Sequence, residues 1–96
     1  MRRTHDMLIG DVLKEFFERP YVKYKVAEGK LPDTWREVVG ERAAAVTSSI
    51  KLENHVLYVH ITSAIIRHEL FMRRDAIAAA INQVSGVKLV NVLIIK

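Results

Sequence analysis

Residues 63–84 read SAIIRHELFMRRDAIAAAINQV, and the pattern of this stretch decides the fold. Wound as a helix, it places apolar side chains on one stripe at intervals of three, four or seven residues: Ile66, Leu70, Ile77, Ile81 and Val84. Ser63 offers a hydroxyl that can cap the start, and Gly86 is a natural C-terminal cap just beyond the end. We therefore expect the other elements to cover one face of this stretch.

The stripe is interrupted at residues 72–75, Met-Arg-Arg-Asp. Arg73 would project into the centre of the apolar stripe, where a charge is costly unless the side chain reaches solvent or pairs. Two structures remain open: one bent helix with Arg73 extended to solvent, or a break after which Asp75 caps a second helix. The sequence pattern supports these two structures almost equally and slightly favours the bent helix.

The segments on either side of this stretch alternate between apolar and polar residues, which is typical of β-strands. Between Thr47 and Thr62 the alternation is interrupted at Asn54-His55, a two-residue turn that predicts a β-hairpin. Val87–Ile95 predicts a third strand that is apolar on both faces apart from Lys88 and Asn91. Since the hairpin makes the first two strands neighbours, the third strand must lie at an edge of the sheet.

The first part of the chain predicts two helices. In Asp6–Arg19, apolar residues gather on one face, and Pro20 stops the helix because it disfavours helical geometry in the preceding residue. Tyr21–Glu28 is a weaker helix that Gly29 closes. These helices are long enough to cover one side of the sheet, though not plainly both.

A third helix is predicted after a turn at Leu31-Pro32. Thr34 opens it with Glu37 at capping-box spacing, and Gly40 either ends it or lies inside a longer helix that reaches Ala45. The predicted core combines this helix with the central stretch: Trp35, Val39, Leu70, Ile77 and Ile81. The fold class is therefore α+β, in which N-terminal helices, a β-hairpin, a long helix and a third strand form a three-stranded sheet packed on helices.

Length and composition indicate a single domain over residues 1–96, with residues 1–5 as a flexible basic arm. Hydrophobic residues make up 50% and charged residues 27% of the chain, as in ordinary globular proteins. Cysteine is absent, which excludes disulfides and thiolate metal sites. No secretory signal or apolar membrane span is visible, so we expect a cytoplasmic protein with no membrane partner. The net charge of +4 favours polyanionic partners only mildly.

The sequence contains no phosphate-binding loop, nucleophile elbow or metal-spaced histidine pair, so we expect no enzymatic activity, cofactor or metal. His55, His60 and His68 are predicted on a turn, an outer strand face and an exposed helix side, where solvated histidines are far commoner than metal ligands. Glu69 and Asp75 are better explained by helix charge pairing than by a catalytic carboxylate pair.

A basic surface with aromatic side chains is the feature that favours binding. Lysine and arginine neutralise phosphates while aromatic rings stack on bases, a combination typical of single-strand binding. The candidate nucleic-acid-binding residues are Lys51, Tyr58, His60, Arg67, Arg73, Arg74 and Lys88, with Lys96 on the last strand beside them. The alternative is a solvated helix face next to an ordinary strand tyrosine, and the modest net charge leaves that alternative open.

The third strand predicts an interface. Val90, Val92 and Ile94 occupy one face and Leu89, Leu93 and Ile95 the other, although an edge strand needs only one buried face. We therefore expect Val90, Val92 and Ile94 to contact a partner or a second copy, and a second copy would form a homodimer through this strand. The alternative is that the N-terminal helices cover the strand.

Several motifs together resemble the DciA family of bacterial proteins, which load or operate the replicative DnaB helicase. They are Leu-Pro-Asp-Thr-Trp-Arg-Glu-Val-Val-Gly at 31–40, Ala-Val-Thr at 45–47, His-Glu-Leu at 68–70 and Ile-Asn at 81–82. The resemblance runs from about Leu8 to Ile95. It implies a fold like a type II KH domain, with the third strand parallel to the second, and a helicase and single-stranded or forked DNA as partners.

Three departures from the family pattern affect these expectations. Asn54-His55 replaces the frequent Asp-Gly turn, and Ile66 stands where an aromatic residue is common. The Gly-x-x-Gly loop of true KH domains would fall at residues 72–75, which contain no glycine and offer only charge. Two function classes remain open: a non-enzymatic replication accessory protein with weak nucleic-acid binding, and a free-standing KH-like module that binds RNA or single-stranded DNA.

Overall fold

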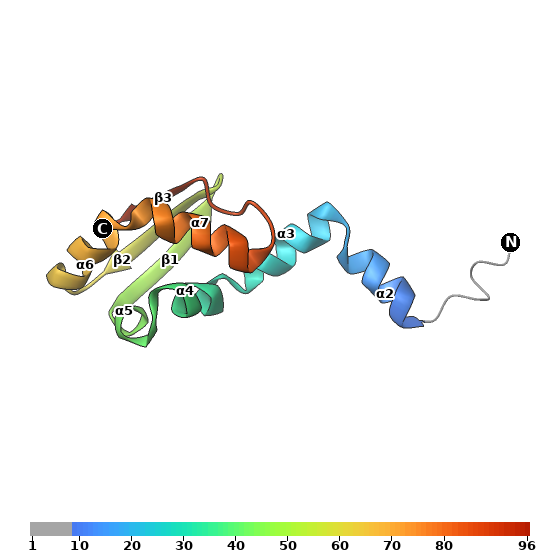
Figure 1. The fold of residues 1–96 in the computed structure, drawn as a ribbon, viewed down its shortest axis with the longest axis horizontal. Helices are drawn as coiled ribbons and strands as arrows, with labels where there is room; N and C mark the ends of the chain where they lie inside the picture. The colour runs from blue at the N-terminus through green and yellow to red at the C-terminus, as the bar shows by residue number, and fades with distance from the viewer. Residues whose placement is uncertain (1–8) are drawn as a thin grey trace, which may run out of the picture.

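The computed structural model describes residues 9–96, so the expectations for the arm at 1–5 and for a cap at Asp6 lie outside the described part. The elements follow the predicted order of helices, hairpin, helical stretch and strand (Figure 1). In chain order they are α2 (Ile9–Phe17), α3 (Pro20–Gly29), α4 (Leu31–Val39), α5 (Glu41–Ala45), β1 (Thr47–Glu53), β2 (Val56–Ile61), α6 (Ala64–Met72), α7 (Arg74–Ser85) and β3 (Val92–Ile95).

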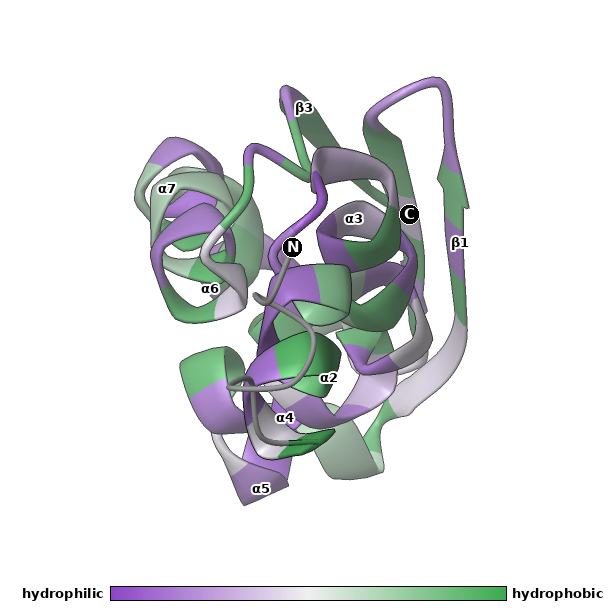
Figure 2. Ribbon diagram, turned by 90° about the vertical axis from the view of Figure 1, so that its right-hand side faces the viewer, coloured by the Kyte–Doolittle hydropathy of each residue, from purple (hydrophilic) through white to green (hydrophobic). Residues whose placement is uncertain are grey.

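The strands form a three-stranded sheet in the order β1-β2-β3. β1 is antiparallel to β2, and β3 runs parallel to β2 at the edge, after the chain has crossed over through α6 and α7. The predicted α+β class and the edge position of the third strand are confirmed. The helices gather on one side of the sheet, with β1 at the opposite margin of the molecule (Figure 2).

The hairpin turn has the geometry that its length demands. Asn54 and His55 both have positive φ, at 51° and 65°, as in a type I′ turn whose twist matches the strands. The His55 ring compensates for this unfavourable conformation, because its Nδ1 is hydrogen-bonded to the carbonyl oxygen of Leu89 at 3.2 Å and it packs edge-on against Tyr24. The predicted Asn54-His55 hairpin is confirmed.

The central stretch is broken, and the expectation of one bent helix is wrong. α6 ends at Met72 and α7 begins at Arg74, with Arg73 between them at φ −113° and ψ 15°. Arg73 is exposed, so the break removes the charge from the apolar stripe without any need for a buried partner. Asp75 lies in the first turn of α7 and is not its cap.

The hydrophobic core lies between the helices and the inner face of the sheet. Trp35, Leu70, Ile77 and Ile81 are buried in it, and Val39 is half-buried against it. The start of α6 is capped as expected, since the Ser63 hydroxyl accepts a hydrogen bond from the Ile66 amide at 3.4 Å. Val84, the last residue of the predicted stripe, is instead 45% exposed.

The third helix begins earlier than predicted. Leu31 and Pro32 form the first turn of α4, where proline is tolerated because its missing N–H would have no helical partner. Thr34 is therefore buried inside the helix and does not open it, so the predicted capping box with Glu37 is absent. Gly40, at φ 92°, ends α4 and separates it from α5.

The third strand is shorter than predicted, covering Val92–Ile95 in place of Val87–Ile95. The preceding connector is held by one side chain at the end of α7. Asn82 Oδ1 accepts hydrogen bonds from the Leu89 and Val90 amides at 2.9 and 2.8 Å, and its Nδ2 donates to the Val90 carbonyl at 2.8 Å. At Leu89 and Val90 these bonds take the place of the inter-strand hydrogen bonds that a longer β3 would form. Both residues are buried.

The first helix does not cover the sheet, so the alternative in which both N-terminal helices cover it is wrong for α2, whereas α3 packs Ala27 and Tyr24 against the core. α2 contains no buried residue and extends away from the rest of the domain (Figure 1). Its apolar face is exposed and consists of Ile9, Val12, Leu13, Phe16 and Phe17. Within residues 9–96, none of the helices is both long and apolar enough to cross a bilayer.

Candidate nucleic-acid and partner interfaces

The outer face of the sheet brings polar and aromatic side chains together in cross-strand rows. The cross-strand register pairs Lys51 with Tyr58 and Ser49 with His60, while Tyr58 also pairs with Ile94. Lys51 and His60 are exposed and Tyr58 is half-buried. Together with Lys96, these side chains line a shallow hollow on the outer face. Three of the candidate nucleic-acid-binding residues, Lys51, Tyr58 and His60, therefore share one surface.

A bulge in β1 positions the histidine on this face. The register shifts between Thr47 and Ser49, which leaves Ser48 as the extra residue. Its hydroxyl oxygen lies 3.2 Å from Nδ1 of His60 and 3.3 Å from the His60 carbonyl oxygen. The ring is therefore held on one edge while its other edge remains open to solvent.

The remaining basic candidates do not join this surface. Arg67 donates a hydrogen bond from Nη2 to the Ile61 carbonyl at 2.8 Å, which fixes its guanidinium at the end of β2. Arg74 donates to the Phe71 carbonyl at 2.9 Å and lies over the Phe71 ring, beside the exposed Arg73 at the α6–α7 junction. Lys88 is exposed on the connector after α7, next to a hollow that Asp75 also lines. The single basic rim expected around the central stretch is therefore dispersed.

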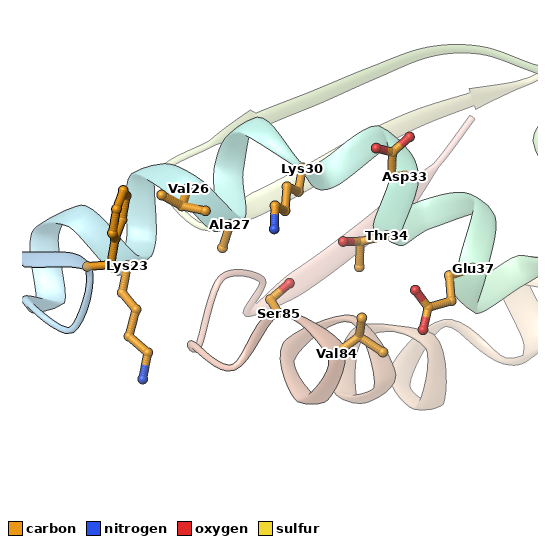
Figure 3. Close-up of a pocket in the computed structure, with 10 residues that line it drawn as sticks. Lys23, Val26, Ala27, Lys30, Asp33, Thr34, Glu37, Val84 and Ser85 are labelled. Carbon is orange, nitrogen blue, oxygen red and sulfur yellow. The ribbon is translucent and has the colours of Figure 1, made fainter. Parts of the chain in front are cut away.

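A groove with mixed charge separates α3 and α4 from the end of α7 (Figure 3). Lys23 and Lys30 line it together with the carboxylates of Asp33 and Glu37. The Ser85 hydroxyl is buried there and has no hydrogen-bond partner among residues 9–96. Opposite charges on neighbouring walls do not select an anion, so this groove is a poor candidate for phosphate binding.

Among the apolar surfaces exposed within residues 9–96, those on β3 and α2 differ in how well the sequence predicted them. On β3, Val92 is 50% and Ile94 36% exposed, whereas Val90 is buried in the core and unavailable to a partner. The α2 stripe was visible in the sequence as an amphipathic pattern, but no sequence signal distinguished an exposed stripe from a packed one.

The expected interface at β3 leads to a test by charge insertion. If this strand joins two copies, Val92→Asp should shift a dimer to monomer in sedimentation equilibrium, because a carboxylate would be desolvated in an apolar contact. The melting temperature should remain that of the parent, since Val92 is half-exposed. Asn91→Asp adds the same charge at an exposed neighbour and serves as control. A parent chain that is monomeric at high concentration would contradict the homodimer.

The potential metal-ligating side chains of residues 9–96 are dispersed. Over residues 9–96, no three histidine, aspartate or glutamate side chains gather closely enough to hold a metal ion. The His55 ring is hydrogen-bonded to the Leu89 carbonyl at the hairpin turn, and His60 and His68 are both exposed.

Comparison with known proteins adds one finding. A protein-family model described as "Dna[CI] antecedent, DciA" matches residues 8–95, nearly the whole chain. The searches returned no match among curated proteins and none among solved structures.

Proposed function

Because the chain belongs to the DciA family of replication accessory proteins, we propose that it binds the replicative DnaB-type helicase and assists its loading on single-stranded or forked DNA. It does so without catalysing a reaction, in the bacterial cytoplasm, and its own contact with nucleic acid is weak. The match over residues 8–95 is the observation that carries this proposal.

The exposed stripe of α2 is the surface best suited to the helicase. Five large apolar side chains lie on a helix that contributes no buried residue to its own domain. An amphipathic helix of this kind binds by laying its apolar face into a groove or against another helix. Asp11 and Lys14 lie on the same helix and provide a polar rim around the apolar contact.

A matched pair of alanine variants tests this contact. Leu13→Ala should weaken binding to the helicase hexamer roughly tenfold or more, as expected for an apolar anchor at the centre of an interface. Lys14→Ala changes the neighbouring polar position and should leave affinity within about twofold. Fluorescence anisotropy with the labelled chain and the helicase of the same organism provides the measurement. Equal affinities for both variants would remove α2 from the interface, and no binding by the parent would contradict the proposed function.

The alternative, a free-standing KH-like module that binds RNA or single-stranded DNA, is favoured by the open outer face of the sheet. Lys51, Tyr58 and His60 would serve such a module without any helicase. Tight binding of an oligonucleotide together with no binding of the helicase would support this alternative.

A further inference from the structure

The outer face of the sheet presents two rings in succession along β2. Tyr58 and His60 are separated by one residue, so both point outward with their Cα atoms about 6.6 Å apart. Sheets that bind single strands use aromatic side chains in this way, stacking one base on each ring. The contact between His60 and Ser48 fixes the ring before any ligand arrives, which lowers the entropic cost of binding.

Two lysines flank these rings. Lys51 lies opposite Tyr58 in the register, and the ammonium group of Lys96 lies 5.5 Å from the centroid of the Tyr58 ring. Within residues 9–96 neither lysine forms an ion pair with a carboxylate. An exposed cation–π contact is weaker than the stacking of a base, so an incoming base can displace Lys96 toward its phosphate.

The charge on this face favours a polyanion over a neutral partner. Lys51 and Lys96 outnumber Glu53, the acidic side chain that lines the same hollow. The other candidate places fit a single strand less well: the groove between α3, α4 and α7 mixes both signs of charge, and Arg67 and Arg74 are hydrogen-bonded to backbone carbonyls.

We propose that the outer face of the sheet binds single-stranded DNA along β2, with successive bases stacked on Tyr58 and His60 and the adjoining phosphates at Lys51 and Lys96. The assignment to DNA rests on the proposed function in replication. The site differs from a Gly-x-x-Gly cleft, because the sheet supplies both the stacking and the charge.

The contribution of the Tyr58 ring to binding can be tested separately from the stability of the fold. We expect Tyr58→Ala to weaken binding of a fluorescein-labelled twelve-thymidine oligonucleotide about 5- to 150-fold, the range measured for loss of one stacked base. Tyr58→Phe keeps the ring and should bind within about twofold of the parent. Anisotropy at low salt gives both affinities, and a thermal melt of each variant checks the fold.

The lysines provide a second test that does not depend on Tyr58→Ala folding. Lys51→Ala should reduce the slope of log K against log salt by about 0.7, as expected for one lost phosphate contact to a single strand. Lys88→Ala is the matched control, since it removes the same charge from an exposed position on the connector after α7. Its slope should equal that of the parent.

Several results would overturn the proposal. These are a parent chain that does not bind the oligonucleotide, Tyr58→Ala and Lys51→Ala variants that bind like the parent, or a Lys88→Ala variant that loses as much slope as Lys51→Ala. RNA of matched length that binds ten times more tightly than DNA would overturn the assignment to DNA. If the Tyr58 and Lys51 variants dissociate a dimer while oligonucleotide binding is unchanged, the face is a protein interface.

The same variants separate this site from the proposed function. Tyr58→Ala and Lys51→Ala should bind the helicase hexamer as the parent does, because neither residue lies on α2. A parent that binds helicase but not the oligonucleotide refutes the sheet site and leaves the helicase role standing. A parent that binds the oligonucleotide but not helicase refutes the helicase role and leaves the sheet site standing.

Discussion

Replacing Trp35 with alanine should lower the free energy of unfolding by about 3–5 kcal/mol, the usual cost of deleting a large buried aromatic side chain. Trp35 is 1% exposed and joins three elements. Its Nε1 donates a hydrogen bond to the Thr47 hydroxyl at 3.0 Å, and that hydroxyl donates to the Ala43 carbonyl at 2.8 Å. The substitution therefore leaves a cavity and also breaks the link between α4, α5 and β1.

Thermal unfolding followed by circular dichroism measures this effect. For a domain of this size, each kcal/mol lowers the melting temperature by about 4–8 °C, so the fall should be at least about 12 °C. Arg36→Ala, at the exposed neighbouring position, is the control and should melt close to the parent. A Trp35→Ala variant that melts within a few degrees of the parent would show that the indole contributes little to the core.

Replacing Asn82 with alanine should cost about 2–3 kcal/mol, because it leaves the amide and the carbonyl of Val90 without hydrogen-bond partners in a buried segment. The Leu89 amide loses less, since it also lies 2.9 Å from the Val87 carbonyl oxygen. Asn82→Asp should also destabilise, because its carboxylate would face the Val90 carbonyl oxygen. The structure thus gives a physical reason for the Ile-Asn motif at 81–82.

Hydrogen exchange at the Val90 amide, together with the melting temperature, reports on this clamp. Exchange should accelerate in Asn82→Ala but not in Gln83→Ala, which changes an exposed neighbour on the same helix. Slow exchange at Val90 in Asn82→Ala would show that the buried connector holds its place without the side chain.

Features that depend on neighbouring residues could be predicted from the sequence. The turn at Asn54-His55 pairs Glu53 with Val56, and the same register brings Lys51 opposite Tyr58. The hairpin and part of the sheet-face site therefore followed from turn length and a period of two. The bulge at Ser48 gave no sequence signal, although it fixes His60.

The break at Arg73 was harder to predict because both alternatives satisfied the local pattern. A bent helix and two helices bury the same stripe, and they differ in where one guanidinium is placed. The broken form leaves Arg73 in solvent and keeps Leu70 and Ile77 buried on either side.

The sequence by itself determined the α+β class, the order of the elements, the hairpin and the edge position of the last strand, because periodicity, turns and short connections act locally. Only the tertiary structure decided which apolar faces are covered. Val90 became buried because Asn82 holds its connector, whereas the stripe of α2 stayed exposed because the helix extends beyond the domain. Burial depends on the surface that a distant segment supplies, and an amphipathic pattern alone does not specify that surface.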